Sequence, residues 1–280
     1  MADAPAISCV IPVYNDKLRL PRAVDSVLRQ GVPVQVVLVD DCSTDGSREL
    51  ILRMAQDDAR IVALPLPWNR GQGYARNLGV AVADAQIVTF LDQDDEHLAG
   101  WYAHALGLLH AHAELAAVKG DIELAEVPPD LSISRADPRW AAMVYSTLWN
   151  VVVRKVVYQA LGGCPVAQAY RTREGVEDAT LVQALTRHFK VAQRDHVATR
   201  HYVNPNGATA YFLRRSRATA SGFEFLELSD AERSGALQQA NLEFQRRVAL
   251  NLEALRAQAP HAAGSDHWLA RVWRRLGGRE

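Results

Sequence analysis

The sequence has few cysteines, no excess of charge of either sign and no long apolar run. Three cysteines, Cys9, Cys42 and Cys164, are scattered over 280 residues. This number and spacing exclude a disulfide framework and a metal site built from paired cysteines, so we expect three free thiols. Lys and Arg together number 31 and Asp and Glu 32, which gives a formal net charge of −1. We therefore expect no nucleic-acid partner, because such proteins carry a clear positive excess.

Signals for membrane insertion and export are missing as well. No stretch approaches the roughly 18 consecutive apolar residues of a transmembrane helix. The first residues, MADAPAISCVIPVYND, contain no basic segment followed by a long apolar one, so we expect no signal peptide. These absences predict a soluble cytoplasmic protein, at most peripheral to the inner face of a membrane.

The first 120 residues alternate between short apolar runs and segments with helical spacing. The apolar runs predict strands at 6–13, 34–39, 61–64, 86–91 and 116–122. The segments between them predict helices at 21–30, 45–54, 74–83 and 98–110. This alternation is typical of an α/β fold with βαβ units, and near-continuous apolar strands indicate a mainly parallel sheet with helices on both faces.

The pattern is looser in the rest of the chain. Residues 126–137 contain Pro128-Pro129 and no clear period, so we expect a loop there. Residues 177–188 have the spacing of a helix. From residue 208 onward the pattern is almost wholly helical, most clearly over 237–257.

Acidic residues follow two of the predicted strands. Asp40-Asp41 comes after the second strand, and Asp92-Gln93-Asp94-Asp95 comes after the fourth. Ligands of doubly wound sheets bind beyond the carboxyl ends of the strands. A single carboxylate there could cap the next helix. Two clusters at one sheet edge repel each other unless a counter-charge is present, and a divalent cation shared with phosphate oxygens would supply it.

Four segments, in this order over residues 6–95, carry a resemblance to a known family. They are ISCVIPVYN, VVLVDDCSTDGS, NRGQGYARNLGVA and IVTFLDQDD. Together they resemble the family 2 glycosyltransferases of GT-A fold. A later Val176-Glu177-Asp178, followed by an apolar stretch, is similar to the acceptor-side motif of that family.

The resemblance implies a division of the chain. Residues 1–205 would form the GT-A domain, with a nucleotide-sugar-binding half at 6–122 and an acceptor-binding half at 123–205. Residues 206–280 match no family that we can name, and we expect them to form a helical C-terminal extension.

The resemblance also implies which residues bind the nucleotide sugar. Tyr14 would stack on or flank the base, and Asp41 would accept the imide proton of the base with support from Asp40. Arg76 would lie near the base and diphosphate, although a surface arginine on a helix is the alternative. Asp92 would face the ribose. Pro12 and Gln93 complete the predicted donor site.

The segment Asp92-Gln93-Asp94 fills the position of the family's DXD motif. By this match, Asp94 would bind Mg²⁺ or Mn²⁺ bridging the diphosphate. Asp95 would be a second ligand, or alternatively a cap of the following helix. His201 lies about twenty residues after the Val176-Glu177-Asp178 motif, where many relatives carry a metal- or diphosphate-binding histidine, and an ordinary histidine is the alternative.

Asp178 matches the catalytic base of the family. Inversion requires a base that takes the proton of the acceptor hydroxyl on the face opposite the leaving group. An N-cap of the helix that follows is the alternative. Glu177 and Trp149 are predicted on the acceptor side, although a tryptophan is more often part of the core. We expect the loops at 126–137 and 164–174 to shape the choice of sugars.

The implied function is inverting, metal-dependent transfer from a nucleoside-diphosphate sugar, with a UDP-sugar as first choice. The acceptor would be a hydroxyl of a glycan or lipid-linked saccharide in surface-polysaccharide biosynthesis. Two alternatives stay open, a catalytically silent module that binds sugar nucleotide or glycan and a sugar nucleotidyltransferase. The latter usually has a glycine-rich phosphate loop after its first strand, where this chain has IPVYNDKLRL.

The C-terminal segment HWLARVWRRLGGR has the spacing of an amphipathic helix. Its apolar side chains fall within one arc of about 140°, with arginines on the opposite face. Tryptophans beside a cationic face fit a helix lying on an anionic membrane surface. The alternative is that the apolar face packs on the body of the protein or on a second subunit in a homodimer.

Overall fold

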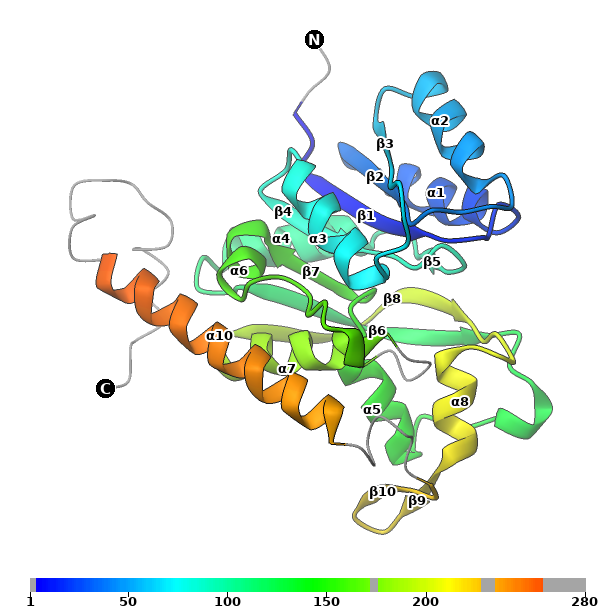
Figure 1. Cartoon of the computed structure of the whole chain (residues 1–280), viewed down its shortest axis with the longest axis vertical. Helices are drawn as coiled ribbons and strands as arrows, with labels where there is room; N and C mark the ends of the chain where they lie inside the picture. The colour runs from blue at the N-terminus through cyan, green and yellow to red at the C-terminus, as the bar shows by residue number, and fades with distance from the viewer. Residues whose placement is uncertain (1–3, 172–175, 228–234, 259–280) are drawn as a thin grey trace.

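An eight-stranded sheet with the strand order β3-β2-β1-β4-β7-β6-β8-β5 runs through the protein (Figure 1). The computed structural model describes residues 4–171, 176–227 and 235–258. Helices pack on both faces of the sheet, so the predicted α/β fold class is confirmed. All three cysteines are free thiols, as predicted.

The N-terminal half of the sheet is parallel. Its strands are β1 (Ile7–Val13), β2 (Val34–Asp40), β3 (Ile61–Pro65) and β4 (Ile87–Phe90). The helices of this half are α1 (Leu20–Leu28), α2 (Ser47–Asp57), α3 (Gln72–Val82) and α4 (Trp101–Ala111). Every residue of β1, β2 and β4 is buried, which is the environment that their unbroken apolar runs predict. Val13 pairs with Asp40, so the chain leaves β1 and β2 at one edge of the sheet.

The second half of the sheet is mixed. It contains β5 (Glu96–His97), β6 (Ala117–Ala125), β7 (Val151–Arg154) and β8 (Val191–Tyr202). β7 is antiparallel to β4 and β6, β8 is parallel to β6, and β5 is antiparallel to β8. The sequence pattern does not predict β8, because polar and partly exposed residues interrupt its apolar ones. The loop predicted at 126–137 is confirmed apart from the short 3₁₀ turn η1 (Pro129–Leu131).

Besides α4, which packs on β6 and β8, three helices cover the mixed half of the sheet. They are α5 (Pro138–Ser146), α6 (Lys155–Ala160) and α7 (Glu177–His188), and the last has the bounds that the sequence predicts. A second 3₁₀ turn, η2 (Gln168–Tyr170), lies in the loop before α7.

The C-terminal part contains a hairpin between its helices. The elements are α8 (Ala208–Arg215), β9 (Ser216–Thr219), β10 (Gly222–Phe225) and α10 (Ala236–Gln258). The prediction of helix from residue 208 onward therefore holds for α8 and α10 and misses the hairpin β9–β10. The division of the chain at residues 122 and 205 stays a prediction.

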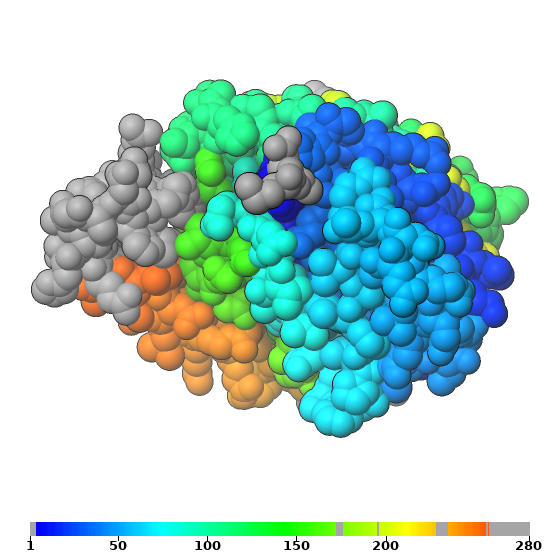
Figure 2. Space-filling model, turned by 90° about the horizontal axis from the view of Figure 1, so that it is seen from above, coloured from blue at the N-terminus to red at the C-terminus, as the bar shows by residue number. Residues whose placement is uncertain are grey.

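Helix α10 packs on the second half of the protein. It buries Phe244, Val248 and Leu252 in the same apolar cluster as residues of α6 and α7. The side-chain oxygen of Asn241 accepts hydrogen bonds from Tyr170 Oη at 2.7 Å and Thr180 Oγ1 at 3.0 Å. Figure 2 shows α10 in orange on the side of the molecule away from the blue and light-blue N-terminal elements.

No helix within the described ranges combines the length and apolar character that crossing a membrane requires. The predicted amphipathic segment at 267–279 lies outside the described residues, so its membrane and subunit contacts stay predictions.

Candidate functional site

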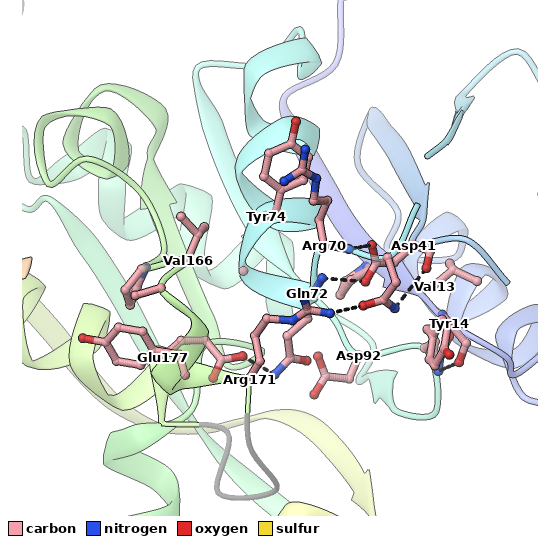
Figure 3. Close-up of a pocket in the computed structure, with 18 of the residues that line it drawn as sticks. Val13, Tyr14, Asp41, Arg70, Gln72, Tyr74, Asp92, Val166, Arg171 and Glu177 are labelled. Atoms are coloured by element: carbon pink, nitrogen blue, oxygen red, sulfur yellow. Dashed lines mark hydrogen bonds between the residues drawn. The ribbon is translucent and has the colours of Figure 1, made fainter. Parts of the chain in front are cut away.

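A cavity of about 380 Å³ opens beyond the carboxyl ends of β1, β2 and β4 (Figure 3). Its lining comes from four segments of the parallel half, from the loop that precedes α7 and from the first residue of that helix. The lining residues are Pro12, Val13, Tyr14, Asp41, Asn69, Arg70, Gly71, Gln72, Gly73, Tyr74, Asp92, Gln93, Asp94, Pro165, Val166, Ala167, Tyr170, Arg171 and Glu177. We call it the first cavity. Described residues of loop 164–174 line its wall, whereas no residue of loop 126–137 does, and the predicted part of both loops in the choice of sugars stays a prediction.

Asp41 holds one wall of the first cavity in place. Its Oδ1 accepts a hydrogen bond from the backbone of Arg70 at 2.6 Å, and its Oδ2 accepts one from Gly71 at 2.7 Å. Burial raises the pKa of Asp41, and these hydrogen bonds oppose the shift. Gly71 has a φ of 85°, which favours glycine at this turn. Asp40 is fully buried behind Asp41 and accepts a hydrogen bond from Arg48 Nε at 3.1 Å.

Gln93 joins the ends of β1 and β4. Its amide oxygen accepts a hydrogen bond from the Tyr14 backbone nitrogen at 2.8 Å, and its amide nitrogen donates to the Tyr14 carbonyl at 2.9 Å. The Tyr14 side chain is left 49% exposed on the cavity wall, where a flat ligand can lie against its ring. In Figure 3, Gln72, Asp92 and Arg171 lie close together in the middle of the cavity, while the Arg70 side chain lies beside Tyr74.

A second cavity, of about 390 Å³, meets the first at Gln72, Asp92 and Asp94, which line both. Besides these three its walls come from β6, β8, α5, α7, α8, β10 and neighbouring loops. The further lining residues are Ile122, Leu124, Ala142, Met143, Ser146, Thr147, Trp149, Val176, Asp178, Ala179, His201, Tyr202, Asn204, Gly207, Ala208, Thr209, Tyr211, Phe212, Arg215, Phe223 and Phe225.

Asp178 lies in the first turn of α7, where the positive end of the helix dipole favours a carboxylate. Val176 is the N-cap of this helix, so the alternative that Asp178 is the cap is wrong. The Leu148 backbone nitrogen lies 3.4 Å from Asp178 Oδ2. Burial raises the pKa of Asp178 to about 7, although the nearby cation of Arg76 opposes the shift.

Arg76 lies beneath the junction of the two cavities and lines neither of them. Its side chain is fully buried, so the alternative of a surface arginine is wrong. Its guanidinium donates to Asp178 Oδ1 at 2.5 Å and to Asp92 Oδ1 at 2.7 Å. Arg76 therefore links the carboxylate of the second cavity to one that faces both. A contact of Arg76 with base or diphosphate stays a prediction.

Arg76→Gln is expected to destabilise the fold by about 3–5 kcal/mol, because the buried carboxylates of Asp178 and Glu177 lose their cation. The free energy of unfolding of Arg76→Lys should lie between those of this variant and the wild type. An ammonium keeps the positive charge, but it cannot make both hydrogen bonds. Urea unfolding followed by circular dichroism measures the difference.

The matched control is Arg29→Gln. Arg29 pairs with Asp25 at 2.5 Å on the surface, where both side chains are mostly exposed. A surface pair contributes about 0–1 kcal/mol. Equal free energies of unfolding for the two Gln variants would contradict the structural role of Arg76.

The acidic cluster after β4 is divided between cavity and interior. Asp94 lines both cavities, and burial together with the charges of Asp95 and Asp92 raises its pKa to about 7. Its cationic neighbour is Arg19, whose Nη1 lies 3.3 Å from Asp94 Oδ2. Asp95 is fully buried and lines neither cavity.

Asp95 binds His201 and the strand that carries it. Its Oδ2 lies 2.8 Å from His201 Nδ1, and its Oδ1 accepts a hydrogen bond from the Tyr202 backbone at 3.0 Å. Helix α4 begins after Gly100, so the alternative that Asp95 caps it is wrong.

His201 has a partner at both ring nitrogens. Besides Asp95, its Nε2 lies 2.8 Å from Thr209 Oγ1. The ring stacks on Trp149, with centroids 5.0 Å apart and planes at 13°. Burial lowers the pKa of His201, but Asp95 and its acidic neighbours outweigh this and raise it to about 8.

The two residues predicted on the acceptor side are separated by the structure. Trp149 lines the second cavity, where one face of its ring is covered by His201. Glu177 lines the first cavity and accepts a hydrogen bond from the Gln72 side chain. Burial raises the pKa of Glu177 as well.

A family model described as "Glycosyl transferase family 2" matches residues 8–163, more than half of the chain. The chain belongs to this family. A similar curated relative is the putative teichuronic acid biosynthesis glycosyltransferase TuaG of Bacillus subtilis, which is 39% identical over 93 residues. That match covers 33% of this chain and 37% of TuaG. The chain spans between 26% and 37% of the length of the first curated relatives that it matches.

Solved structures of glycosyltransferases share the fold. S. aureus TarS in complex with UDP-GlcNAc matches 86% of this chain and 72% of the TarS chain, with a TM-score of 0.57 and 18% identity. The mannosyltransferase PcManGT from Pyrobaculum calidifontis, in complex with GDP-Man and Mn²⁺, matches 97% of this chain and 79% of its own, with a TM-score of 0.55 and 20% identity. These similarities confirm the predicted GT-A-like fold.

Several residues of the site are not among the predicted ones, although the family motifs surround some of them. Gln72 lies within NRGQGYARN and lines both cavities. Arg171 reaches the first cavity from the loop before α7, and its guanidinium donates a hydrogen bond to the Asn69 side chain. Phe223 and Phe225 reach the second cavity from the hairpin. In the segment GFEF, apolar Phe223 and Phe225 alternate with a polar residue, and this alternation could have indicated a strand with both rings on one face.

Proposed function

We propose that this protein transfers a sugar from a nucleoside-diphosphate sugar to a hydroxyl of a glycan or lipid-linked acceptor, with inversion and with a divalent metal ion. The observation that carries the proposal is the meeting of two cavities at Gln72, Asp92 and Asp94. A donor in the first cavity and an acceptor in the second would place their reacting atoms at this junction. Asp178 lines the acceptor side of it.

The first cavity suits a nucleotide. Tyr14 offers an exposed ring for a base, and Asp41 lies on the same wall with oxygens that accept N–H donors. Asp92 lies between this wall and the second cavity, where a ribose or sugar hydroxyl could donate to it. Because TarS is described with UDP-GlcNAc and PcManGT with GDP-Man, both bases belong in any test, with a UDP-sugar as first choice.

Asp178 is the proposed general base. Its carboxylate takes the proton from the acceptor hydroxyl as the oxygen attacks the anomeric carbon. The bond from that carbon to the diphosphate oxygen breaks, and its electron pair leaves with the nucleoside diphosphate. A pKa near 7 suits a base at neutral pH, because an effective base has a pKa close to the working pH. One carboxylate is enough for this single displacement.

The residues at the junction fit a divalent cation. Asp92 and Asp94 face the junction, and burial together with the charges of Asp95 and Asp92 raises the pKa of Asp94, which is the environment that a cation relieves. Asp94 would hold the ion, while the further predicted ligands, His201 and Asp95, are hydrogen-bonded to each other. No group of three or more metal-binding side chains occurs among the residues that the structure describes. Diphosphate oxygens would therefore complete the coordination, as is common for Mg²⁺. When bound, the ion neutralises charge that develops on the leaving diphosphate.

Donor binding is expected to raise the melting temperature in the presence of Mn²⁺. A ligand at 100 times its dissociation constant stabilises a protein by about 2.7 kcal/mol. The measurement is thermal unfolding with a panel of UDP-, dTDP- and GDP-sugars, followed by an assay for transfer with the donors that bind. A stabilising donor that releases its nucleoside diphosphate to an acceptor supports the proposal.

The other outcomes of this test each contradict part of it. Binding without transfer to any glycan or lipid-linked acceptor would favour the silent module. Consumption of a nucleoside triphosphate and a sugar phosphate would favour the nucleotidyltransferase. No shift with any sugar nucleotide would contradict the donor site itself.

A further inference from the structure

The second cavity is lined by two kinds of side chain. Around Asp178 it presents polar groups, among them Asp92 and His201. Its remaining wall is largely apolar and includes three phenylalanines, Phe212 of α8 and Phe223 and Phe225 of β10. We call these three the aromatic wall. A cavity with a reactive carboxylate and an aromatic wall suits a ligand that is polar in one part and apolar in another.

The aromatic wall is packed as a unit and still faces solvent. The ring centroids of Phe212 lie 5.3 Å from Phe223 and 6.0 Å from Phe225, and Phe223 lies 5.6 Å from Phe225. All three pairs are edge-to-face, the arrangement that aromatic rings prefer. Phe223 is 36% exposed and Phe225 is 43% exposed. Core residues are not left this open, so the wall has apolar surface available to a ligand.

The backbone around the aromatic wall is fixed by partly buried hydrogen bonds. Arg139 donates hydrogen bonds to the carbonyls of Ser216 at 3.0 Å and Leu213 at 3.3 Å, and it pairs with Asp137 at 2.7 Å. The hydroxyl of Ser216, which is buried, donates to the carbonyl of Phe212 at 2.7 Å. These contacts hold the start of β9 against α5 and α8, so the wall is formed before any ligand arrives.

The wall belongs to the part of the chain beyond the family match. The family model ends at residue 163, whereas α8 and the hairpin occupy 208–225. In Figure 1 the hairpin lies at the end of α8 and α5 that faces away from the parallel strands. The three rings of the aromatic wall therefore lie outside the segment that the family model matches.

We infer that the acceptor presents an apolar face to Phe212, Phe223 and Phe225 while its hydroxyl lies at Asp178. This inference rests on the proposed function, because it assigns the second cavity to the acceptor. Two sources provide such a face: the C–H side of a second sugar ring and an apolar aglycone. Both bind aromatic rings by the same burial of apolar surface.

The inference is tested by binding in the absence of a donor. Saturation-transfer NMR is recorded with glucose, the disaccharide cellobiose, phenyl β-glucoside and octyl β-glucoside below its micelle concentration. We expect cellobiose or the two glucosides to bind at least about tenfold more tightly than glucose, because only they bury additional apolar surface against the three rings. Preference for cellobiose identifies a sugar ring as the source, and preference for the glucosides identifies an aglycone.

The double variant Phe223→Ala/Phe225→Ala should lose this preference, while its stabilisation by a sugar nucleotide stays at the wild-type level. The matched control is Leu226→Ala, because Leu226 follows Phe225, is 55% exposed and does not line the cavity. Binding of every compound no tighter than that of glucose, or an equal effect of the control and the double variant, would overturn the inference. If donor binding fails while the preference is found, the proposed function fails and the apolar site remains.

Discussion

Asp178→Asn is expected to lower kcat by about 10²-fold or more, in line with the usual contribution of a general base. Asparagine keeps the size of the side chain and an oxygen that can accept the hydrogen bond of Arg76, but it cannot accept a proton at neutral pH. Donor affinity should change little, because Asp178 lines the second cavity and not the first. Initial rates and thermal shifts with the donor, measured side by side, separate the two effects.

The pH dependence of the wild type provides a second measure of the same group. The base acts in its deprotonated form, so kcat should fall as the pH falls through the pKa of Asp178, which burial raises to about 7. Above that pH, kcat should no longer change with pH on the acid side of the profile, which we call the acid limb. Asp178→Asn should lack this limb, since the group that titrates is gone.

Glu177→Gln is the comparison that locates the base. Glu177 neighbours Asp178 but lines the first cavity and bonds to Gln72, so its replacement should leave the acid limb in place. Full activity of Asp178→Asn, or loss of the acid limb in Glu177→Gln alone, would move the base to Glu177.

The strands that border the first cavity could be predicted, because strands buried on both faces have continuous apolar sequences. Residues of β1, β2 and β4 are buried on both faces, and this gives unbroken apolar runs. β8 is partly exposed, so its apolar residues are interrupted and no simple period indicates a strand. The hairpin β9–β10 has strands of four residues, too short to stand out within a helical region.

The motifs located the side chains of the site but not their partners. Arg76 and Asp178 are 102 residues apart in the sequence, and nothing in either motif indicates that one binds the other. The same holds for Asp95 and His201, which are 106 residues apart. Such pairs depend on how α7 and β8 dock against the parallel half, which is a property of the tertiary structure. The sequence therefore predicts which groups gather at the sheet edge, while the structure determines which face a ligand.

Asp94→Ala is expected to abolish transfer and the metal-dependent part of donor binding. Asp94 is the carboxylate of the cluster that lines both cavities, whereas Asp95 is turned inward to His201. Burial and the charges of neighbouring carboxylates raise the pKa of Asp94, so its charged form is unfavourable in the folded protein. Its replacement by alanine should therefore leave the fold intact or stabilise it. Thermal shifts with a sugar nucleotide, recorded with Mn²⁺ and with EDTA, should differ in the wild type and coincide in Asp94→Ala.

The control for this variant is Asp57→Ala, which removes an exposed carboxylate at the end of α2, outside both cavities. It should keep the difference between Mn²⁺ and EDTA. Because the diphosphate is expected to supply the remaining ligands, Mn²⁺ alone should stabilise the wild type much less than Mn²⁺ with the sugar nucleotide. Transfer by Asp94→Ala at a near wild-type rate with EDTA present would show that Asp94 holds no essential ion. The positive charge that balances the leaving diphosphate would then have to come from a side chain, and Arg171, which reaches the first cavity beside Asp92, is the cation to replace next.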